Sequence, residues 1–333
     1  MRLGILTHLH VGDDAADAYR IALELFEAAD ALGYDSGWVA QHHFLNGGGR
    51  MPSSLAFLAA AAQRTRRIGL GTAIMILPLE DPLRLAEDAA VVDTLSGGRL
   101  QLGLGTGADP LTFAAFGATV NTRRELYGDK FQQLSCALQG EPINDTQASL
   151  YPPATGLTQR LWESTLSPDS ARRIGSHGSG LLLARTAFMS DEPTDQNQLP
   201  VALAYEESHL GPQTARIGLS RAVYPAADKR TAMAHLDAGV VEYVQSMIDR
   251  GFFPKGLTRY AYYARTHIHY GTPEEVVASL QSDVVLPHTT ELICQVHPGH
   301  PTPAQMLTAL ERTAREVAPA LGWSPVTAGG PRR

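Results

Sequence analysis

The stretch of sequence that decides the fold is residues 68–105, IGLGTAIMILPLEDPLRLAEDAAVVDTLSGGRLQLGLG. It opens with an apolar run at Ile68–Leu77 and closes with a second apolar run at Leu100–Gly105. Nearly continuous apolar runs are typical of strands that helices cover on both faces of a parallel sheet. Between the runs, Pro82 follows Asp81 as at the start of a helix, where a missing N–H group costs nothing. The stretch is therefore a strand–helix–strand unit with parallel strands.

The same alternation continues through the 333-residue chain. Two of the intervening helices are predicted to begin with capping boxes, Thr272-Pro273-Glu274-Glu275 and Thr302-Pro303-Ala304-Gln305. The eight predicted strands are Leu3–Thr7, Ser36–Gln41, Ile68–Leu77, Leu100–Gly105, Arg160–Thr165, Gly180–Ala184, Thr214–Ala222 and Glu291–Val296. Eight strands that alternate with helices predict a closed (β/α)8 barrel, the TIM barrel, more often than an open sheet.

Two long segments interrupt the repeating unit. Residues 139–160 form a predicted insertion before the fifth strand, and residues 250–272 form a long aromatic connection before the last helix–strand unit. Loops of this length are usually functional or mobile, so the second segment is expected to be a mobile lid. We expect residues 1–323 to form a single barrel domain and residues 324–333 to form a flexible C-terminal tail.

Composition limits the function. The chain has 27 Lys and Arg residues against 34 Asp and Glu residues, a net charge of -7, which disfavours binding to nucleic acid or to an anionic membrane. Its apolar runs fall short of the about 18 residues that a membrane span needs. The N-terminus lacks the pattern of a signal peptide, and two cysteines, Cys136 and Cys294, are too few for a secreted disulfide scaffold. A soluble, cytoplasmic protein is expected.

Barrel enzymes carry their chemistry at the C-terminal ends of the strands, and two such ends contain notable residues. The second strand ends at Gln41-His42-His43, where an imidazole either takes part in proton transfer or only orients the loop. In the third strand, Gly71 and Ala73 either let a flat ring approach the backbone or only fit a crowded barrel interior. The residues alone leave both pairs of alternatives open.

Two further strand ends suggest ligand binding. The fourth strand ends in Gly103-Leu104-Gly105-Thr106-Gly107, which has only part of the spacing of a dinucleotide-binding turn. After the fifth strand, Ser167 and Pro168 begin a helix whose free N–H groups suit an anion, together with the hydroxyls of Ser167 and Ser170. Ordinary helix capping explains these residues about equally well.

The chain also contains two His-x-His pairs, His8 with His10 and His267 with His269. The first pair lies at the end of the first strand, where metal-dependent barrel hydrolases carry such a pair. Those sites also take ligands from later strands, whereas the fifth and sixth strands here end without histidine and the eighth offers no aspartate. No metal site is therefore predicted.

In their order and spacing, these segments resemble the bacterial luciferase-like flavin-dependent monooxygenases, and the resemblance covers nearly the whole chain. The runs that carry it are Gly33-Tyr34-Asp35, Trp38-Val39-Ala40-Gln41-His42-His43-Phe44, Gly71-Thr72-Ala73 through Leu77-Pro78, Asp81-Pro82-Leu83-Arg84-Leu85-Ala86-Glu87-Asp88, Leu95-Ser96-Gly97-Gly98-Arg99-Leu100, Leu102-Gly103-Leu104-Gly105 and His269-Tyr270-Gly271-Thr272-Pro273-Glu274-Glu275.

The resemblance implies the barrel fold, a homodimer, and reduced FMN supplied by a separate flavin reductase. Molecular oxygen would form a flavin 4a-hydroperoxide that transfers one oxygen atom to a small organic substrate. His42 corresponds to the histidine needed for this oxygen chemistry, and in the family the peptide that here links Ala73 and Ile74 is often a cis bond. The residues that the resemblance places at the cofactor are Thr72, Ala73, Ile74, Gly105, Thr106, Ser167 and Ser170.

The chain departs from the family pattern at two positions. Gln41 stands where relatives commonly have Glu, and Thr106 stands where the luciferase members place an arginine on the FMN phosphate. Arg172, Arg173 or Arg185 is expected to supply the missing charge. Three alternatives to a monooxygenase stay open: a deazaflavin-dependent oxidoreductase on the same barrel, a non-catalytic flavin-binding protein and, least favoured, a metal-dependent hydrolase.

Overall fold

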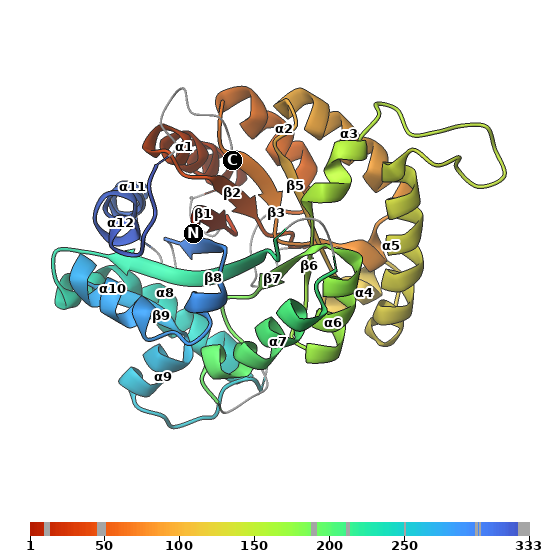
Figure 1. Ribbon diagram of the computed structural model, residues 1–333. Coiled ribbons are helices and arrows are strands. Elements are labelled where there is room, and N and C mark those ends of the chain that lie inside the picture. The colour runs from red at the N-terminus through yellow and green to blue at the C-terminus, as the bar shows by residue number, and fades with distance from the viewer. Residues whose placement is uncertain are drawn as a thin grey trace.

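The structure, a computed structural model, describes residues 1–9, 14–44, 51–187, 192–210, 214–249, 251–296, 299 and 301–325. Its centre is a barrel of eight parallel strands (Figure 1). The strands are β1 (Arg2–Thr7), β2 (Ser36–Val39), β3 (Gly69–Thr72), β4 (Met75–Ile76), β5 (Leu100–Gly105), β6 (Leu161–Ser164), β7 (Gly180–Leu183), β8 (Ile217–Pro225), β9 (Ile268–Gly271) and β10 (Glu291–Gln295). Strand β1 pairs with both β2 and β10, and β10 pairs with β8, which closes the ring. Strands β3 and β4 follow one another beside β5 and share one position of the ring, and β9 pairs with β8 outside it, so the ten strands give eight barrel positions. The predicted (β/α)8 TIM barrel is confirmed.

Each of the eight predicted strands contains or overlaps a strand of the barrel. The third prediction, Ile68–Leu77, corresponds to two short strands, β3 and β4, and the peptide bond between Ala73 and Ile74, which lies between them, is cis. The prediction for β8 began too early and ended too early, since β8 continues to Pro225 and pairs there with β9.

Residues 250–272, predicted to be one long aromatic connection, contain helix α9 (Arg259–Arg265) followed by β9, a strand that was not predicted. The aromatic side chains of Phe253 and Tyr263 are buried in the core and pack this segment against the barrel. That the segment moves as a lid stays a prediction.

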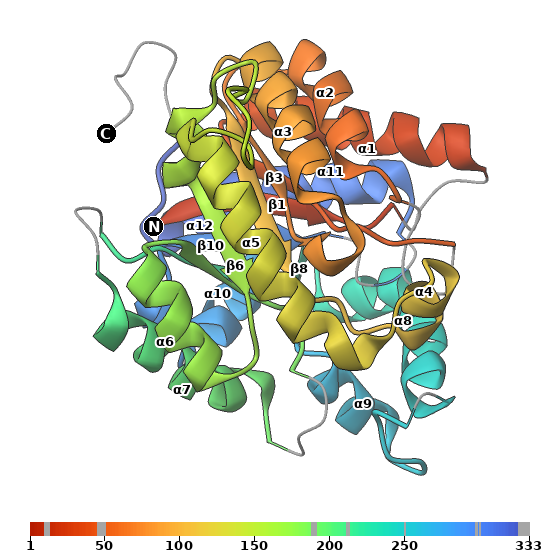
Figure 2. The same cartoon turned by 90° about the vertical axis from the view of Figure 1, so that its right-hand side faces the viewer.

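Helices surround the barrel, and Figure 2 shows α3 and α5 side by side on its outer wall. The predicted capping boxes at Thr272 and Thr302 are both present. The remaining helices are α1 (Ala15–Leu32), α2 (Ser54–Arg64), α3 (Pro82–Ser96), α4 (Pro110–Ala115), α5 (Arg123–Gln139), α6 (Pro168–His177), α7 (Thr194–Ser208), α8 (Lys229–Asp249), α10 (Pro273–Gln281), α11 (Pro303–Arg312) and α12 (Ala318–Ala320). Short 3-10 turns η1 (Leu77–Leu79), η2 (Val120–Thr122), η3 (Thr155–Arg160) and η4 (Leu286–His288), and a π-helical turn η5 (Thr313–Val317), complete the described elements.

The predicted insertion at residues 139–160 contains η3 and otherwise runs as turns and bends. In Figure 1 it is the yellow-green segment that projects from the barrel after α5. Near the C-terminus, the Trp323 indole donates to Asp35 at 2.9 Å and packs beside Tyr34, so the chain contacts the barrel up to this residue. Most of the predicted tail, residues 326–333, lies outside the described residues, and the single-domain division stays a prediction.

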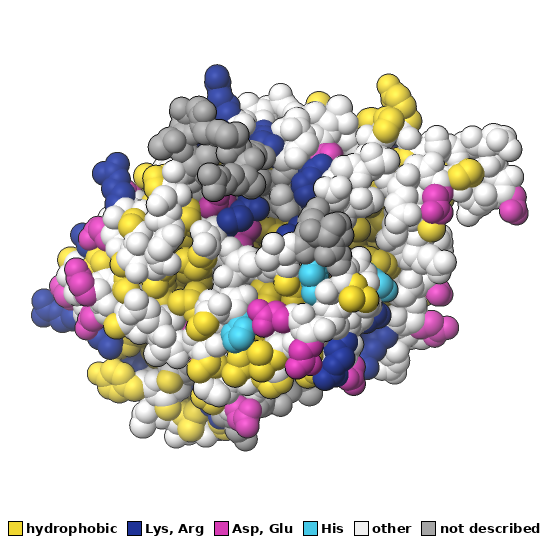
Figure 3. All heavy atoms as spheres, viewed as in Figure 1, with side chains coloured by type: hydrophobic (Ala, Val, Ile, Leu, Met, Phe, Trp, Pro, Cys, Tyr) yellow, Lys and Arg dark blue, Asp and Glu magenta, His cyan; other side chains and the backbone are white. Residues whose placement is uncertain are grey.

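On the face shown in Figure 3, basic and acidic side chains lie intermixed rather than in one patch of a single charge. Among the described residues, every helix is too short or too polar to cross a membrane.

Two tryptophans fill the barrel interior. Trp38 of β2 and Trp162 of β6 are at most 2% exposed and meet edge to face, with ring centroids 5.5 Å apart. Each indole lies flat against a glycine of the next strand: a Cβ atom at Gly71 would lie 2.1 Å from the Trp38 ring, and one at Gly180 would lie 2.3 Å from the Trp162 ring. Of the two open interpretations of Gly71, the crowded interior is therefore the correct one.

Replacing Gly71 tests this packing. Gly71→Ala should lower the free energy of unfolding by about 1–3 kcal/mol, because the added methyl group must displace a buried indole. Gly128→Ala is the matched control, since Gly128 lies within α5 and has open space around it; alanine there should stabilise the helix by about 0.5–1 kcal/mol. Urea denaturation of both variants measures the difference, and equal stabilities would contradict the packing described.

Candidate active site

A large cavity lies at the C-terminal ends of the barrel strands. Its volume is about 1920 Å³, and all eight barrel strands or the loops that follow them contribute to its wall. The lining includes Leu6, Ala40, Ala73, Leu182 and Ile293, which belong to the same hydrophobic cluster as Trp38 and Trp162. The tryptophans thus lie beneath an apolar cavity floor. The cavity exceeds the about 300–1,000 Å³ of a typical ligand site and has room for a cofactor beside a second molecule.

Two histidines from adjacent strands meet in the cavity wall. His8 follows β1 and His42 follows β2, and Nδ1 of His8 lies 2.9 Å from Nε2 of His42. Burial, followed by the neighbouring His43, lowers the pKa of His42 to about 4, against a smaller opposing effect of Asp109. The His42 ring is therefore neutral at neutral pH.

The residues on either side of His42 have different contacts. The Gln41 amide donates to Glu80 at 2.8 Å, and its oxygen accepts from the backbone N–H of Ile76 at 2.7 Å. A glutamate at position 41 would place a second carboxylate against that of Glu80, and the two negative charges would repel each other. The uncharged Gln41 therefore suits its neighbour Glu80 better than the residue common in the family. The His43 ring packs edge to face on Phe116, and its Nε2 is buried without a hydrogen-bond partner among the described residues.

The structure brings seven of the eight predicted site residues to the cavity. Besides His42, the lining residues are Ala73, Ile74, Gly105, Thr106, Ser167 and Ser170. Thr72 is the exception, since it is fully buried and its hydroxyl both donates to the carbonyl and accepts from the N–H of Gly103, each at 2.8 Å. The Thr72 side chain therefore joins β3 to β5 and does not line the cavity. Ala73, unlike Gly71, does lie where a ring could approach it.

The polar end of the cavity is the start of α6. Ser167 is the N-cap residue of this helix, but its side chain makes no capping hydrogen bond. Its hydroxyl and that of Ser170 are half-buried and line the cavity. Because the cap is not closed by the protein, the first N–H groups of α6 can receive an anion.

The three arginines expected to replace the family arginine differ in position. Arg172 is exposed and pairs with Asp169, and it does not line the cavity. Arg173 lines the cavity but lies 3.0 Å from the buried carboxylate of Glu163, which balances its charge. Arg185 lines the cavity and stacks on the Tyr243 ring at 4.8 Å. Arg185 is thus better placed than Arg172 to meet a ligand.

Several lining residues escaped the sequence analysis. His8 was considered only as a metal ligand with His10, which lies outside the described residues, although its position after a strand could have indicated the site. Arg123 and Arg124 also line the cavity, but they begin α5 after a turn outside the barrel and carry no recognisable motif.

Comparison with known proteins agrees with this geometry. The profile of the family described as luciferase-like monooxygenase matches residues 1–285. The chain belongs to this family. A relative, the 4-hydroxyprotoasukamycin monooxygenase of Streptomyces nodosus subsp. asukaensis, is 34% identical over 189 residues, which cover 53% of this chain and 50% of that protein. The chain thus spans only about half the length of this curated relative.

Solved structures show the same luciferase-like fold. The oxygenating constituent of 3,6-diketocamphane monooxygenase from Pseudomonas putida, solved with FMN, has a TM-score of 0.76 at 18% identity and covers 96% of this chain and 98% of that chain. An F420-dependent secondary alcohol dehydrogenase, solved with an F420–acetone adduct, has a TM-score of 0.69 at 15% identity and covers 96% of this chain and 98% of that chain. At these identities the likeness concerns the fold alone.

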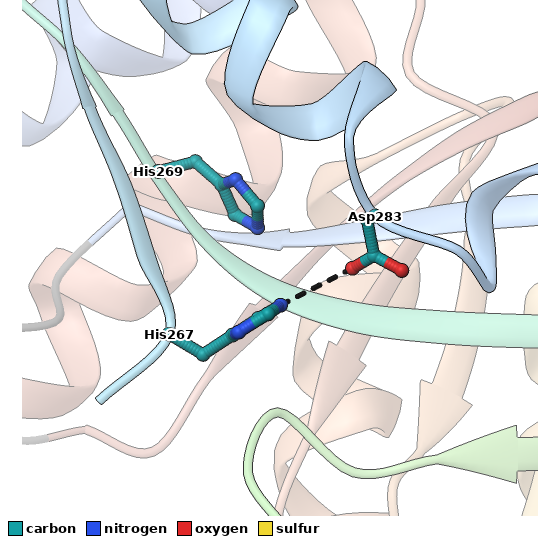
Figure 4. Close-up of side chains that lie close together, drawn as sticks. All are labelled: His267, His269 and Asp283. Atoms are coloured by element: carbon teal, nitrogen blue, oxygen red, sulfur yellow. Dashed lines mark hydrogen bonds and ion pairs between the residues drawn. The ribbon is translucent and has the colours of Figure 1, made fainter. Parts of the chain in front are cut away.

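In this member of the luciferase-like family, the second His-x-His pair lies outside the cavity. His267, His269 and Asp283 have side-chain ligand atoms within 4.8 Å of one another (Figure 4). The same Asp283 oxygen that faces His267 at 3.2 Å also accepts from Nε of the fully buried Arg221 at 2.6 Å. The arginine already balances the carboxylate, so we interpret these residues as a buried ion-pair network that joins β9 to β8 rather than as a metal centre.

Asp283→Asn tests this interpretation. Burial raises the pKa of Asp283, but the His267 hydrogen bond and the Arg221 charge together lower that pKa below its usual range. Removing the charge should therefore cost about 3–5 kcal/mol at pH 7, because Arg221 stays buried and uncompensated. A carboxyl group whose pKa is lowered by folding stabilises the fold at pH values above its unfolded-state pKa of about 4. The difference in the free energy of unfolding between wild type and variant should therefore narrow as the pH falls below about 4.

The control for this experiment is Asp169→Asn, since Asp169 forms an exposed ion pair with Arg172. Exposed pairs contribute about 0–1 kcal/mol, so this variant should unfold almost like the wild type. Chemical denaturation at several pH values gives both comparisons. An Asp283→Asn variant as stable as the control would contradict the network, and stoichiometric zinc in the purified wild type would contradict the prediction of no metal.

Proposed function

We propose that the protein is the oxygenase component of a two-component, FMN-dependent monooxygenase. The proposal rests on one cavity that is lined by three features. These are the neutral histidine His42, the small apolar residues Ala73 and Ile74, and the uncapped N-terminus of α6 with the hydroxyls of Ser167 and Ser170. Family membership and the monooxygenase name of the cited relative support it. A separate flavin reductase would supply reduced FMN, and the substrate would be a small organic molecule.

The residues present fit FMN. Ala73 and Ile74 offer small and aliphatic surface for a flat ring, and Gly105 lies so close to Ile74 that a Cβ atom there would meet the Ile74 side chain at 2.8 Å. Ser167, Ser170 and the α6 N-terminus would hold the phosphate, and Arg185 also lines the cavity. When bound, reduced FMN supplies the electrons that activate molecular oxygen. The protein would need only to orient the cofactor and shield it from solvent.

His42 would act as the proton donor or acceptor for the oxygen transfer. Its neutral imidazole can do either, and it lines the same cavity as the apolar residues Ala73 and Ile74. Thr106 contributes a hydroxyl in place of the family charge, so phosphate affinity would rest on the helix start rather than on one strong cation.

The FMN phosphate should be recognised by α6. Ser170→Ala should weaken FMN binding, because a hydrogen bond to a charged group contributes about 1.5–3 kcal/mol, and Thr106→Arg should strengthen it. Riboflavin lacks the phosphate, so its affinity should change little in either variant. Fluorescence titration with both ligands measures this. Equal affinity of the wild type for FMN and riboflavin would mean that Ser167 and Ser170 bind no phosphate.

His42→Ala should uncouple the reaction. We expect the variant to fold and bind FMN, to lose about 10²–10⁴-fold in oxygenation rate and to release hydrogen peroxide instead, because general acid–base catalysis is lost. The assay uses reduced FMN from a flavin reductase and NADH, with substrates found by screening small ketones, aldehydes and alkenes. His288→Ala is a control, since His288 lies on the surface and contacts Glu206. Normal turnover in His42→Ala would remove this residue from the mechanism.

A deazaflavin-dependent oxidoreductase is the second candidate, favoured by the similar fold of the F420-dependent alcohol dehydrogenase. Its cofactor is distinguished from FMN by its absorption spectrum and by turnover that needs no oxygen. A non-catalytic FMN-binding protein is distinguished by the lack of oxygen-dependent turnover. A homodimeric state, a cytoplasmic location and the partnership with a reductase are further parts of the proposal.

A further inference from the structure

The contact between His8 and His42 couples the protons of two imidazole rings. A distance of 2.9 Å between Nδ1 of His8 and Nε2 of His42 is that of a hydrogen bond, and the ring centroids are 5.1 Å apart. One of these nitrogens must carry a proton and the other a lone pair. For two neutral rings, the position of the shared proton therefore decides whether the far nitrogen of each ring is a donor or an acceptor.

A buried histidine faces a difficulty as a proton donor. Burial and His43 lower the pKa of His42 to about 4, Asp109 opposes this shift, and Glu80 faces His43 rather than His42. At pH 7 a group with such a pKa is protonated in roughly one molecule in a thousand. If the charged His42 ring donated the proton, the donor would be a rare species. If the neutral ring donated it, another group would have to return a proton to His42.

We propose that His8 is the relay partner of His42, passing it a proton so that His42 donates while both rings remain neutral. His42 releases the proton on Nδ1, and the proton on Nδ1 of His8 moves across the hydrogen bond to Nε2 of His42. His8 then takes a proton on its own Nε2 from a buffer acid in the solvent, through a water molecule in the cavity, and the buffer acid is left as its conjugate base. One proton enters, one leaves, and the two rings end as the opposite neutral tautomers; the reverse sequence lets His42 accept a proton.

The position of His8 suits this role. It follows β1, which pairs with β2 so that Thr7 lies opposite Val39, and this register brings the two strand ends together. His8 is half-buried and itself lines the cavity. The relay rests on the proposed function for its use in oxygen transfer, but the coupling of the two rings does not.

The coupling is tested first in the flavin-free protein, by NMR of the ring ¹⁵N nuclei of His42 and His8. We expect a coupling between Nε2 of His42 and Nδ1 of His8 across their hydrogen bond, and we expect His8→Leu to change the tautomer ratio of His42. His8→Asn places an amide where Nδ1 stood, so it should keep His42 hydrogen-bonded. A His42 spectrum unchanged in His8→Leu would overturn the inference whether or not the protein is a monooxygenase.

The relay is tested next by kinetics with reduced FMN and an accepted substrate. An amide can position His42 but cannot pass a proton through itself. His8→Asn and His8→Leu should therefore both lower kcat by about 10²-fold with KM unchanged, and the solvent deuterium isotope effect should change from multi-proton in wild type to single-proton. Recovery of kcat in His8→Asn would show that His8 only positions His42 and would overturn the relay. His288→Asn, a surface replacement, should leave all these readouts unchanged.

Discussion

The packing of two tryptophans against two glycines is the constraint on which the site depends. Trp38 and Trp162 fill the barrel interior only because Gly71 and Gly180 leave room for their rings. The indole N–H of Trp38 donates to the buried Glu291 at 2.9 Å and that of Trp162 to Gln101 at 2.8 Å, so both rings are fixed in orientation. With the interior filled at this level, the cavity lies above it, where the strand ends and their loops provide the polar residues.

The polar residues of this cavity lie at different positions around the barrel. The histidines follow β1 and β2, whereas the hydroxyls of Ser167 and Ser170 begin α6 after β6. Between them lie apolar residues such as Ala73 and Leu182. A ligand with a planar centre and an anionic end would therefore contact different chemistry along its length. Burial lowers the pKa of His42, and the His8 ring 2.9 Å away is the group that we propose returns its proton.

Much of this architecture could be predicted from the sequence, because parallel barrel strands are apolar runs and strand ends carry the chemistry. His42, Ala73 and Ser167 were found in this way. The resemblance placed Thr72 at the cofactor, but its side chain lies away from the cavity, and alternation along a strand does not reveal that its hydroxyl is used by Gly103. The pairing of Arg173 with Glu163 could not be predicted because the two residues are ten positions apart in sequence. Strand β9 has only 4 residues, which are too few to show a strand pattern within the long aromatic segment.

Mass spectrometry of the product formed from ¹⁸O₂ tests most directly whether one cavity binds reduced FMN and uses molecular oxygen to oxygenate a small organic substrate, as we propose. The reaction contains the wild-type protein, a flavin reductase, NADH and FMN. We expect one ¹⁸O atom in each product molecule, and none when the reaction takes place in H₂¹⁸O with unlabelled oxygen. Product that forms without oxygen, or that carries its new oxygen atom from water, would contradict this proposal.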